Sequence, residues 1–213
     1  MIVKQTHDFN ITGKGDALQW NKTAWMDIPF LMGNGKRNET KAKLLYSATG
    51  IYCLFRCEDD ILTAAMQQDL MPLWEEDVVE VFLQPDISQT NYFEYEISPL
   101  NYELPLIVFN SGGSLNRWIP FQYPDDRKTK HAVTAQGGER LPGASVKGWT
   151  AEFFIPYTLM KPVLDKPPVP GSNWKGNLYR IDYDHEQKET LWTLFTNSGN
   201  FHEENNFGYF HFE

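Results

Sequence analysis

The sequence is poor in cysteine, in basic residues and in long apolar runs. Its 213 residues include two cysteines, Cys53 and Cys57. On one strand they would point the same way about 13 Å apart, at ~3.3 Å per residue, which is far beyond disulfide reach. We therefore expect two buried thiols that pack as small apolar groups, and they indicate little about the redox compartment.

Acidic side chains outnumber basic ones. There are 28 Asp and Glu against 19 Lys and Arg, which gives a formal charge of -9. Nucleic acids and anionic membranes both need a basic footprint on their protein partner. The charge balance therefore argues against nucleic acid and against a membrane as partners.

Long apolar runs are absent as well. The N-terminal stretch MIVKQTHDFNITGKG has no apolar h-region, and no window approaches the ~20 apolar residues of a membrane span. We expect a soluble protein with no signal peptide in the chain as given. Its compartment stays open, because a chain whose signal had been removed would be periplasmic or extracellular, and otherwise cytoplasmic.

Aromatic residues are abundant, at 15% of the chain, and apolar residues alternate with polar ones in short runs. The stretch from Trp74 to Pro99 shows this best, because two runs place apolar side chains at every second position, as half-buried strands do. The polar segment QPDISQTN between the runs suits a hairpin connection. We predict an antiparallel hairpin with this buried face: Val79, Val81, Leu83, Phe93, Tyr95 and Ile97.

Short strands recur along the rest of the chain. Residues 41–60 are predicted to form a second hairpin with a tight turn at Thr49 and Gly50, and three strands close the chain. Residues 61–72 have some helical character, and residues 111–130 are predicted to be a long loop. Many strands with little helix predict an all-β fold, an antiparallel β-sandwich of jelly-roll type. The length fits a single domain over residues 1–213.

The opposite face of the central hairpin is acidic. It carries Glu76, Glu80, Glu94 and Glu96. Carboxylates on facing positions of paired strands repel each other unless another group neutralises or hydrogen-bonds them. An Arg or Lys on a neighbouring strand, a bound cation or the hydroxyls of a polar ligand could each do so, and a solvated acidic face that binds nothing is an equal alternative.

Six segments have the sequence character and the order of one known family: EEDVVEVFLQP (75–85), YFEYEISPLN (92–101), WTAEFFIPYTLM (149–160), PGSNWKGNLYRIDY (170–183), LWTL (191–194) and NFHEENNFGYFHF (200–212). Through them the chain resembles the family 9 carbohydrate-binding modules and their stand-alone bacterial relatives. The resemblance implies a sugar-binding β-sandwich that is often attached to, or encoded with, glycoside hydrolases. It also implies a clamp of two aromatic rings, at positions that correspond to Trp74 and to Phe201, where the founding type has Trp.

A sugar is recognised by ring faces that cover its C–H surface and by polar groups that bond its hydroxyls. The candidate rings are Trp74, Trp192, Phe201 and Trp118. The candidate polar groups are Glu75, Asp77, Glu96, Asn177, Arg180, Asn200 and His202. The predicted carbohydrate site consists of Trp74, Glu75, Asp77, Glu96, Arg180, Trp192, Asn200, Phe201 and His202.

Three of these residues have a structural alternative. Trp192 fits the core as well as a site, and Arg180 could neutralise the acidic face. Asp77 could stabilise its loop or bind a structural calcium ion, which the resemblance permits. His202 and His211 lack the spacing of zinc ligands.

Three functions follow, in this order. The first is non-catalytic binding of a mono- or oligosaccharide, linked to polysaccharide catabolism and to a glycoside hydrolase encoded with the chain. The second is a glycoside hydrolase that uses a carboxylate pair such as Glu80 and Glu96, although no activated nucleophile, phosphate loop or metal motif accompanies them. The third is a protein-interaction sandwich that uses the aromatic segment 112–124.

Overall fold

The computed structural model describes residues 1–111, 114–121, 123–125, 128–184, 186 and 188–213. These residues form strands and short 3-10 helices, with no α-helix among them. The strands are β1 (Ile2–Gln5), β2 (Met26–Asp27), β3 (Phe30–Gly33), β4 (Thr40–Tyr46), β5 (Gly50–Glu58), β6 (Val78–Gln84), β7 (Tyr92–Ile97), β8 (Glu103–Ser111), β9 (Ser114–Pro120), β10 (Lys130–Gln136), β11 (Gly148–Pro156), β12 (Asn173–Tyr183), β13 (Glu189–Thr193) and β14 (Gly208–Phe212). The 3-10 helices are η1 (Leu18–Lys22), η2 (Leu73–Glu75) and η4 (Glu204–Asn206). The all-β class is confirmed.

Hydrogen bonds link the strands into one mixed sheet. Its main path runs β10-β11-β5-β4-β1-β14-β12-β6-β7-β8-β9, with β13, β3 and β2 as branches. The described pairs are antiparallel except at β1, which runs parallel to both β14 and β4. The antiparallel prediction is therefore wrong at β1, because no hairpin joins β1 to β4 or to β14, and the long segments between them allow parallel pairing.

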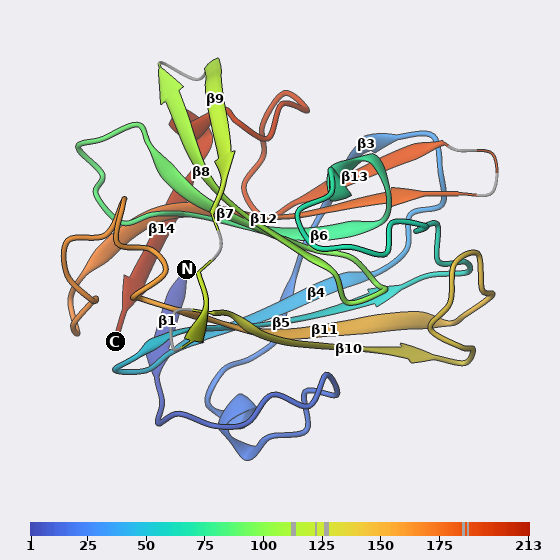
Figure 1. The fold of residues 1–213 in the computed structure, drawn as a ribbon, viewed down its shortest axis with the longest axis horizontal. Helices are drawn as coiled ribbons and strands as arrows, with labels where there is room; N and C mark the ends of the chain where they lie inside the picture. The colour runs from blue at the N-terminus through green and yellow to red at the C-terminus, as the bar shows by residue number, and fades with distance from the viewer. Residues whose placement is uncertain (112–113, 122, 126–127, 185, 187) are drawn as a thin grey trace.

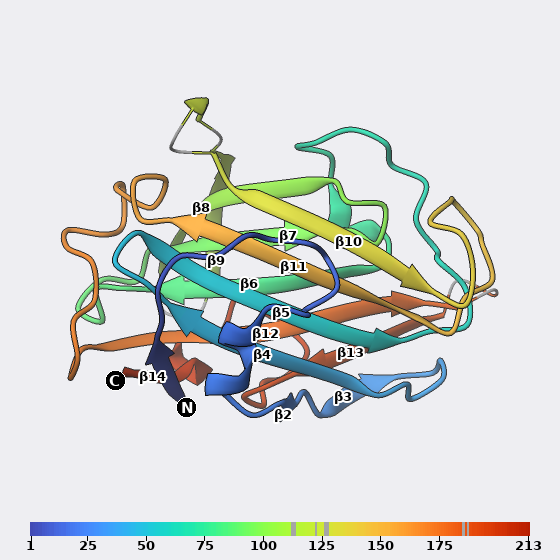
Figure 2. The same cartoon turned by 90° about the horizontal axis from the view of Figure 1, so that it is seen from below.

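The two arms face each other (Figures 1 and 2), with β4, β5, β10 and β11 on one side and β6, β7, β8, β12 and β14 on the other. The main hydrophobic core lies between them and draws on both, for example Phe55 and Phe153 from one arm and Val81 and Tyr95 from the other. This arrangement is consistent with the expected sandwich. A second apolar cluster covers the outer face of the β6–β7–β12 arm and includes Phe82, Tyr92, Tyr179 and Phe201.

The central hairpin is confirmed as β6 and β7. Val81 pairs with Tyr95, and Glu80 pairs with Glu96. All six apolar residues predicted for the buried face belong to the main core. The hairpin of β4 and β5 and the closing strands β12, β13 and β14 are confirmed as well.

The predicted loop over residues 111–130 is wrong in part. Residues Ser114–Pro120 form β9, which pairs with β8 in a hairpin that projects beyond the two arms (Figure 1). Pairing with a long neighbouring strand supplies backbone hydrogen bonds that the Gly and Pro content of the segment did not indicate. Gly112, Gly113 and Gln122 of the proposed interaction segment lie outside the described residues.

The helical turn expected over residues 61–72 is also wrong. This segment contains no helix; its backbone is bonded instead to carboxylates that precede β6. Asp77 accepts the N–H of Thr63 at 2.6 Å, and Glu76 accepts those of Ala65 and Met66 at 2.8 and 3.0 Å. Side-chain acceptors for backbone N–H groups compete with helix formation, so the local preference of the AAMQQ run is overridden.

Cys53 and Cys57 are buried and unbonded to each other, as predicted. Burial raises the pKa of both thiols, that of Cys57 to about 12, so both stay protonated and pack as apolar groups. Among the described residues, no helix is long and apolar enough to cross a membrane.

Candidate functional site

A pocket of about 350 Å³ lies on the outer face of the β6–β7–β12 arm, away from the main core. It brings together four of the nine predicted site residues: Trp74, Asn200, Phe201 and His202. Trp74 belongs to η2, just before β6, while the other three belong to the loop between β13 and β14. Segments more than 120 residues apart in the sequence therefore meet at one place, as the resemblance implied.

The ring faces differ from the expected clamp. Trp74 is half-buried and makes an edge contact with Trp118 of β9, with ring centroids 5.3 Å apart and planes inclined by 69°. Trp118 remains 40% exposed and also lines the pocket. Phe201 is 8% exposed and stacks on Tyr179, with centroids 3.9 Å apart. The accessible aromatic surface is therefore that of Trp74 and Trp118, and Phe201 is built into the wall.

Three carboxyl groups lie beneath these rings. Glu80 and Glu94 line the pocket, and Glu96 lies opposite Glu80 on the paired strand. Their residues are 2%, 3% and 0% exposed, so the alternative of a solvated acidic face is wrong for these three. Phe201, Trp74 and the apolar cluster of this arm cover that face.

Burial without a nearby cation decides the protonation of these groups. It raises the pKa of Glu94 to about 8, and the pKa values of Glu80 and Glu96 lie well above their usual range because burial and mutual repulsion both disfavour the charge. At neutral pH the group holds protons and can donate as well as accept. Glu94 Oε2 is buried, and no N–H or hydroxyl group of a described residue donates to it.

His202 completes this side of the pocket as a neutral group. Burial lowers its pKa to about 4. Its Nδ1 lies 2.6 Å from the hydroxyl of Tyr92, whose pKa burial raises, so the hydroxyl donates to Nδ1 and leaves the ring proton on Nε2. The distance from Nδ1 to Glu94 Oε2 is 3.9 Å, which is too long for a hydrogen bond.

Asp77, Arg180 and Trp192 lie in a different cluster, between the two arms. Arg180 is fully buried, donates from Nη2 to Asp59 Oδ2 at 3.2 Å and also to Asp182, and lies 4.8 Å from the ring of Trp192. The alternative role of Arg180, neutralising the acidic face of the hairpin, is therefore wrong, and Arg180 does not line the pocket either. Successive side chains of β12 alternate between faces, so Arg180 points into the core while Tyr179 points to the pocket side.

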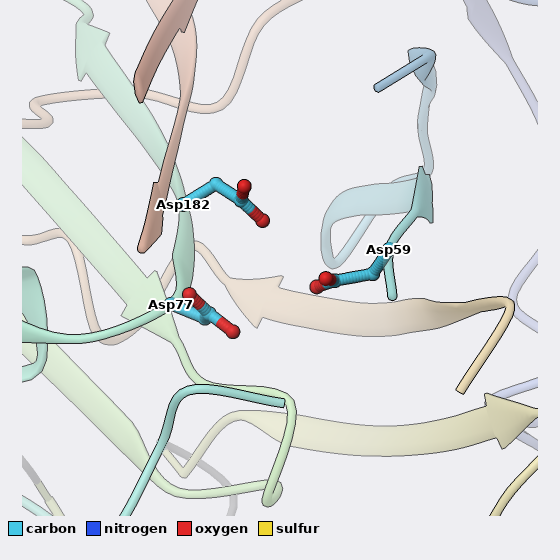
Figure 3. A group of neighbouring side chains, drawn as sticks. All are labelled: Asp59, Asp77 and Asp182. Carbon is cyan, nitrogen blue, oxygen red and sulfur yellow. The ribbon is translucent and has the colours of Figure 1, made fainter. Parts of the chain in front are cut away.

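Asp59, Asp77 and Asp182 converge from β12 and from the ends of β5 and β6 (Figure 3). Among the described residues, they form the one group of three or more His, Cys, Asp or Glu side chains that could hold a metal ion, with one oxygen of each within 4.8 Å of the others. The guanidinium of Arg180 already supplies the positive charge there. Asp77 accepts the N–H of Thr63 and, at 2.8 Å, that of Tyr183. These contacts favour the loop-stabilising alternative for Asp77 and do not fit a calcium site.

Other predicted polar groups lie outside the pocket. Glu75 is exposed on η2, and Glu96 lies behind the carboxyl groups that line the pocket. Asn177 is buried and donates to the hydroxyl of Tyr179 at 2.9 Å and to the carbonyl of Phe195 at 2.8 Å. It therefore supports the wall on which Phe201 stacks.

Glu80 and Glu94 were absent from the predicted carbohydrate site, although both had been placed on the correct face of the hairpin. The register of the hairpin was the signal that could have found them, because Glu80 and Glu94 occupy the same face as Glu96 on adjacent strands. Leu115 of β9 also lines the pocket. Its segment had been predicted to be a loop, so the alternation pattern could not predict which way Leu115 points.

Comparisons with known proteins agree with this fold. Residues 11–105 match the model of the carbohydrate family 9 binding domain-like family. No curated protein matches the sequence.

Solved structures match the whole chain. A family 9 carbohydrate-binding module from Caldicellulosiruptor kristjanssonii in complex with cellotriose has a TM-score of 0.70 at 18% identity, covering 100% of this chain and 94% of that one. Its complex with glucose has a TM-score of 0.69 at 18% identity, with 100% and 96% covered. A candidate carbohydrate-binding protein from Bacteroides uniformis has a TM-score of 0.76 at 17% identity, with 100% and 98% covered. In sequence over residues 11–105 and in fold over its whole length, the chain resembles the family 9 carbohydrate-binding modules.

Proposed function

We propose that the pocket beside Trp74 and Trp118 binds a carbohydrate unit without cleaving it. The observation that carries this proposal is that two accessible indole rings and two buried carboxyl groups line the same pocket. A pyranose presents both of the matching surfaces, an apolar C–H face for the rings and hydroxyls for the carboxyl, amide and imidazole groups.

The polar groups are placed for an uncleaved hydroxylated ligand. No N–H or hydroxyl group of a described residue donates to Glu94 Oε2, and an unsatisfied buried acceptor costs about 1–3 kcal/mol. A ligand hydroxyl that donates to this oxygen removes that cost. Asn200 and His202 offer further donors and acceptors on the opposite side of the pocket. The relatives solved with cellotriose and glucose support a saccharide as the ligand.

The arrangement is poorly suited to glycoside hydrolysis. Hydrolysis needs two carboxyl groups that flank the scissile bond. Glu96 is fully buried and does not line the pocket, so it cannot act with Glu80 on a bound substrate. Glu80 and Glu94 both line it, but they come from one face of adjacent strands, which places them on the same side of a ligand.

The proposal extends to the domain that carries the pocket and to the enzyme with which it acts. We infer a jelly-roll-like sandwich that forms a single domain over residues 1–213, because the main core draws on strands from β1 to β14. Its ligand is a mono- or oligosaccharide, and its role is to hold that sugar for a glycoside hydrolase encoded with it during polysaccharide catabolism. The resemblance to family 9 modules supports this association, and the charge of -9 favours neither nucleic acid nor membrane as partner.

Titration calorimetry with glucose and cellotriose tests the proposal. Trp74→Ala should weaken binding by about tenfold or more, because it removes a stacking ring. Tyr209→Ala is the matched control, since Tyr209 is 47% exposed on β14 and does not line the pocket. Equal affinity of the Trp74 and Tyr209 variants, or no binding of any saccharide by the folded wild type, would contradict the proposal.

A further inference from the structure

The lining of the pocket is acidic in composition and has no fixed positive charge. Glu80 and Glu94 both line it, and none of the described residues that line it is Lys or Arg. His202, the remaining titratable side chain of the lining, is neutral at pH 7 because burial lowers its pKa to about 4. A carboxylate on a ligand would therefore meet two carboxyl groups and no cation.

One carboxyl oxygen in this lining receives no N–H or hydroxyl donor. Glu94 is 3% exposed and its carboxyl group hydrogen-bonds that of Glu96, but no N–H or hydroxyl group of a described residue donates to its Oε2. Polar atoms buried this deeply are nearly always paired in folded proteins, so an unpaired oxygen at a pocket points to a donor supplied by a ligand. Glu80, on the adjacent strand, lines the same part of the pocket.

The groups that face Glu94 offer it no positive charge. They are Glu80 of β6, Tyr92 and Glu96 of β7, Tyr179 of β12 and His202 of the loop before β14. From β8, the residue paired with Glu94 is the apolar Leu106. Each of these described neighbours is an acid or a neutral group at pH 7, so none of them favours the ionised form of Glu94, and a ligand cation would do so.

We propose that the pocket prefers a sugar with a free amino group, a hexosamine, whose ammonium group lies against the carboxyl groups of Glu94 and Glu80. This inference rests on the proposed function, since it names the class of sugar that the same pocket takes. The ammonium donates to Glu94 Oε2, and the proton that the carboxyl group held passes to solvent. The charge added by the ligand is thereby balanced within the pocket.

The proposal predicts an order of affinities among matched sugars. A hydrogen bond to a charged partner is stronger than one between neutral groups, and the difference corresponds to about tenfold in affinity. Glucosamine should therefore bind about tenfold tighter than glucose, and glucuronate, which has no ammonium group, should not share this gain. Glucosamine binding should release a proton, whereas glucose binding should not.

Calorimetry at pH 7 in two buffers of different ionisation enthalpy measures both the affinities and the released proton. Glu94→Gln removes the negative charge and keeps the shape, so the ratio of glucosamine to glucose affinity should fall toward one. Glu75→Gln is the matched control, because Glu75 adjoins Trp74 but is exposed and does not line the pocket, and it should keep the ratio. If Glu94→Gln does not stay folded at the temperature of the titration, Glu80→Gln takes its place, and the same fall in the affinity ratio is expected.

The outcomes separate the two proposals. Glucose binding with glucosamine no tighter than glucose, or with no proton released, would overturn the preference for amino sugars and leave the proposed function standing. Failure of glucose, glucosamine and glucuronate alike to bind the folded protein would overturn both. Tighter glucosamine binding that disappears in Glu94→Gln, but not in Glu75→Gln, supports the assignment.

Discussion

Glu80 of β6 and Glu96 of β7 lie directly opposite each other in a register pair, and both side chains are shielded from water. With Glu94 they form a cluster of three buried carboxyl groups; burial raises the pKa of all three, and the charge of Glu94 further raises the pKa of Glu80 and Glu96. Such a group is stable only while it holds protons, because ionised neighbours in a low-dielectric site repel strongly. The protonation of this group therefore links the pocket to the stability of the fold.

Stability should fall as pH rises from 6.5 to 8. The folded-state pKa of Glu94, about 8, lies above its unfolded value of 4.5, so its contribution is present below pH 4.5 and is lost as pH rises through 8. Each such carboxyl can contribute up to about 1.4 kcal/mol per pH unit to the slope. His202 acts in the opposite sense only below 6.5, since its pKa is lowered to about 4.

Urea unfolding of the wild type and of Glu94→Gln at pH 6.5 and 8.0 measures this slope. The variant should lose less stability over the interval than the wild type, and Glu75→Gln should behave as the wild type does. Identical slopes for the wild type and Glu94→Gln would show that Glu94 is not protonated in the folded state at neutral pH.

Trp118→Ala and Phe201→Ala should separate binding from stability. Trp118 is 40% exposed at the pocket, so its removal should weaken saccharide binding about tenfold and change the free energy of unfolding little. Phe201 is 8% exposed and stacked on Tyr179. Its truncation should cost about 3 kcal/mol or more of stability, as for other buried Phe side chains.

Calorimetry for affinity and urea unfolding for stability distinguish the two variants. If Phe201→Ala abolished binding with no loss of stability while Trp118→Ala changed neither, the ring assignment made from the structure would be wrong, and the clamp implied by the resemblance would be right.

How far the sequence predicts this protein depends on how local each signal is. The alternation in β6 and β7 is local, and it predicts both strands and their buried face correctly. The side chains that cover the acidic face are not close in sequence, because Trp74 lies more than 120 residues before the loop that carries Phe201 and His202.

The partners of Arg180 show the same limit. The sequence contains an acidic hairpin and an arginine, Arg180, on a later strand. An ion pair between Arg180 and the glutamates of the hairpin is the simplest interpretation. The pleat of β12 decides otherwise, because Arg180 alternates with Tyr179 and so faces Asp59 and Asp182 in the core. The alternation along a strand separates its side chains into two faces. Which partners each face meets is known only once the register with a distant strand is known.

Arg180→Met should be strongly destabilising. It would leave Asp59 and Asp182 buried without their cation, and breaking a buried pair in this way costs about 3–5 kcal/mol. Lys36→Met is the matched control, because Lys36 pairs with Asp60 at 2.7 Å on the surface, with both side chains at least 60% exposed. That pair should contribute at most about 1 kcal/mol.

Urea unfolding of both variants gives the comparison, and Asp59→Asn added to Arg180→Met should restore part of the loss by removing one unpaired charge. A loss in Arg180→Met no larger than that in Lys36→Met would show that the buried cluster is balanced by something other than Arg180.

Bound oligosaccharide should remain intact. Glu80 and Glu94 approach a ligand from one side, so these two carboxyl groups do not flank a glycosidic bond. Prolonged incubation of cellotriose with the protein, followed by mass spectrometry, should recover cellotriose alone. Release of shorter sugars by the wild type, and its loss in Glu80→Gln, would establish the hydrolase alternative.

An NMR titration of the tryptophan indole N–H signals with saccharide tests the central claim most directly. The chain has seven Trp residues, and the indoles of Trp20, Trp149 and Trp192 are buried and bonded to Glu152, Asp59 and Asn38, which makes them internal references. The account predicts that the signals of Trp74 and Trp118 shift with saturable dependence on sugar while these three stay fixed. Saturable shifts confined to other tryptophans, or none at all, would contradict it.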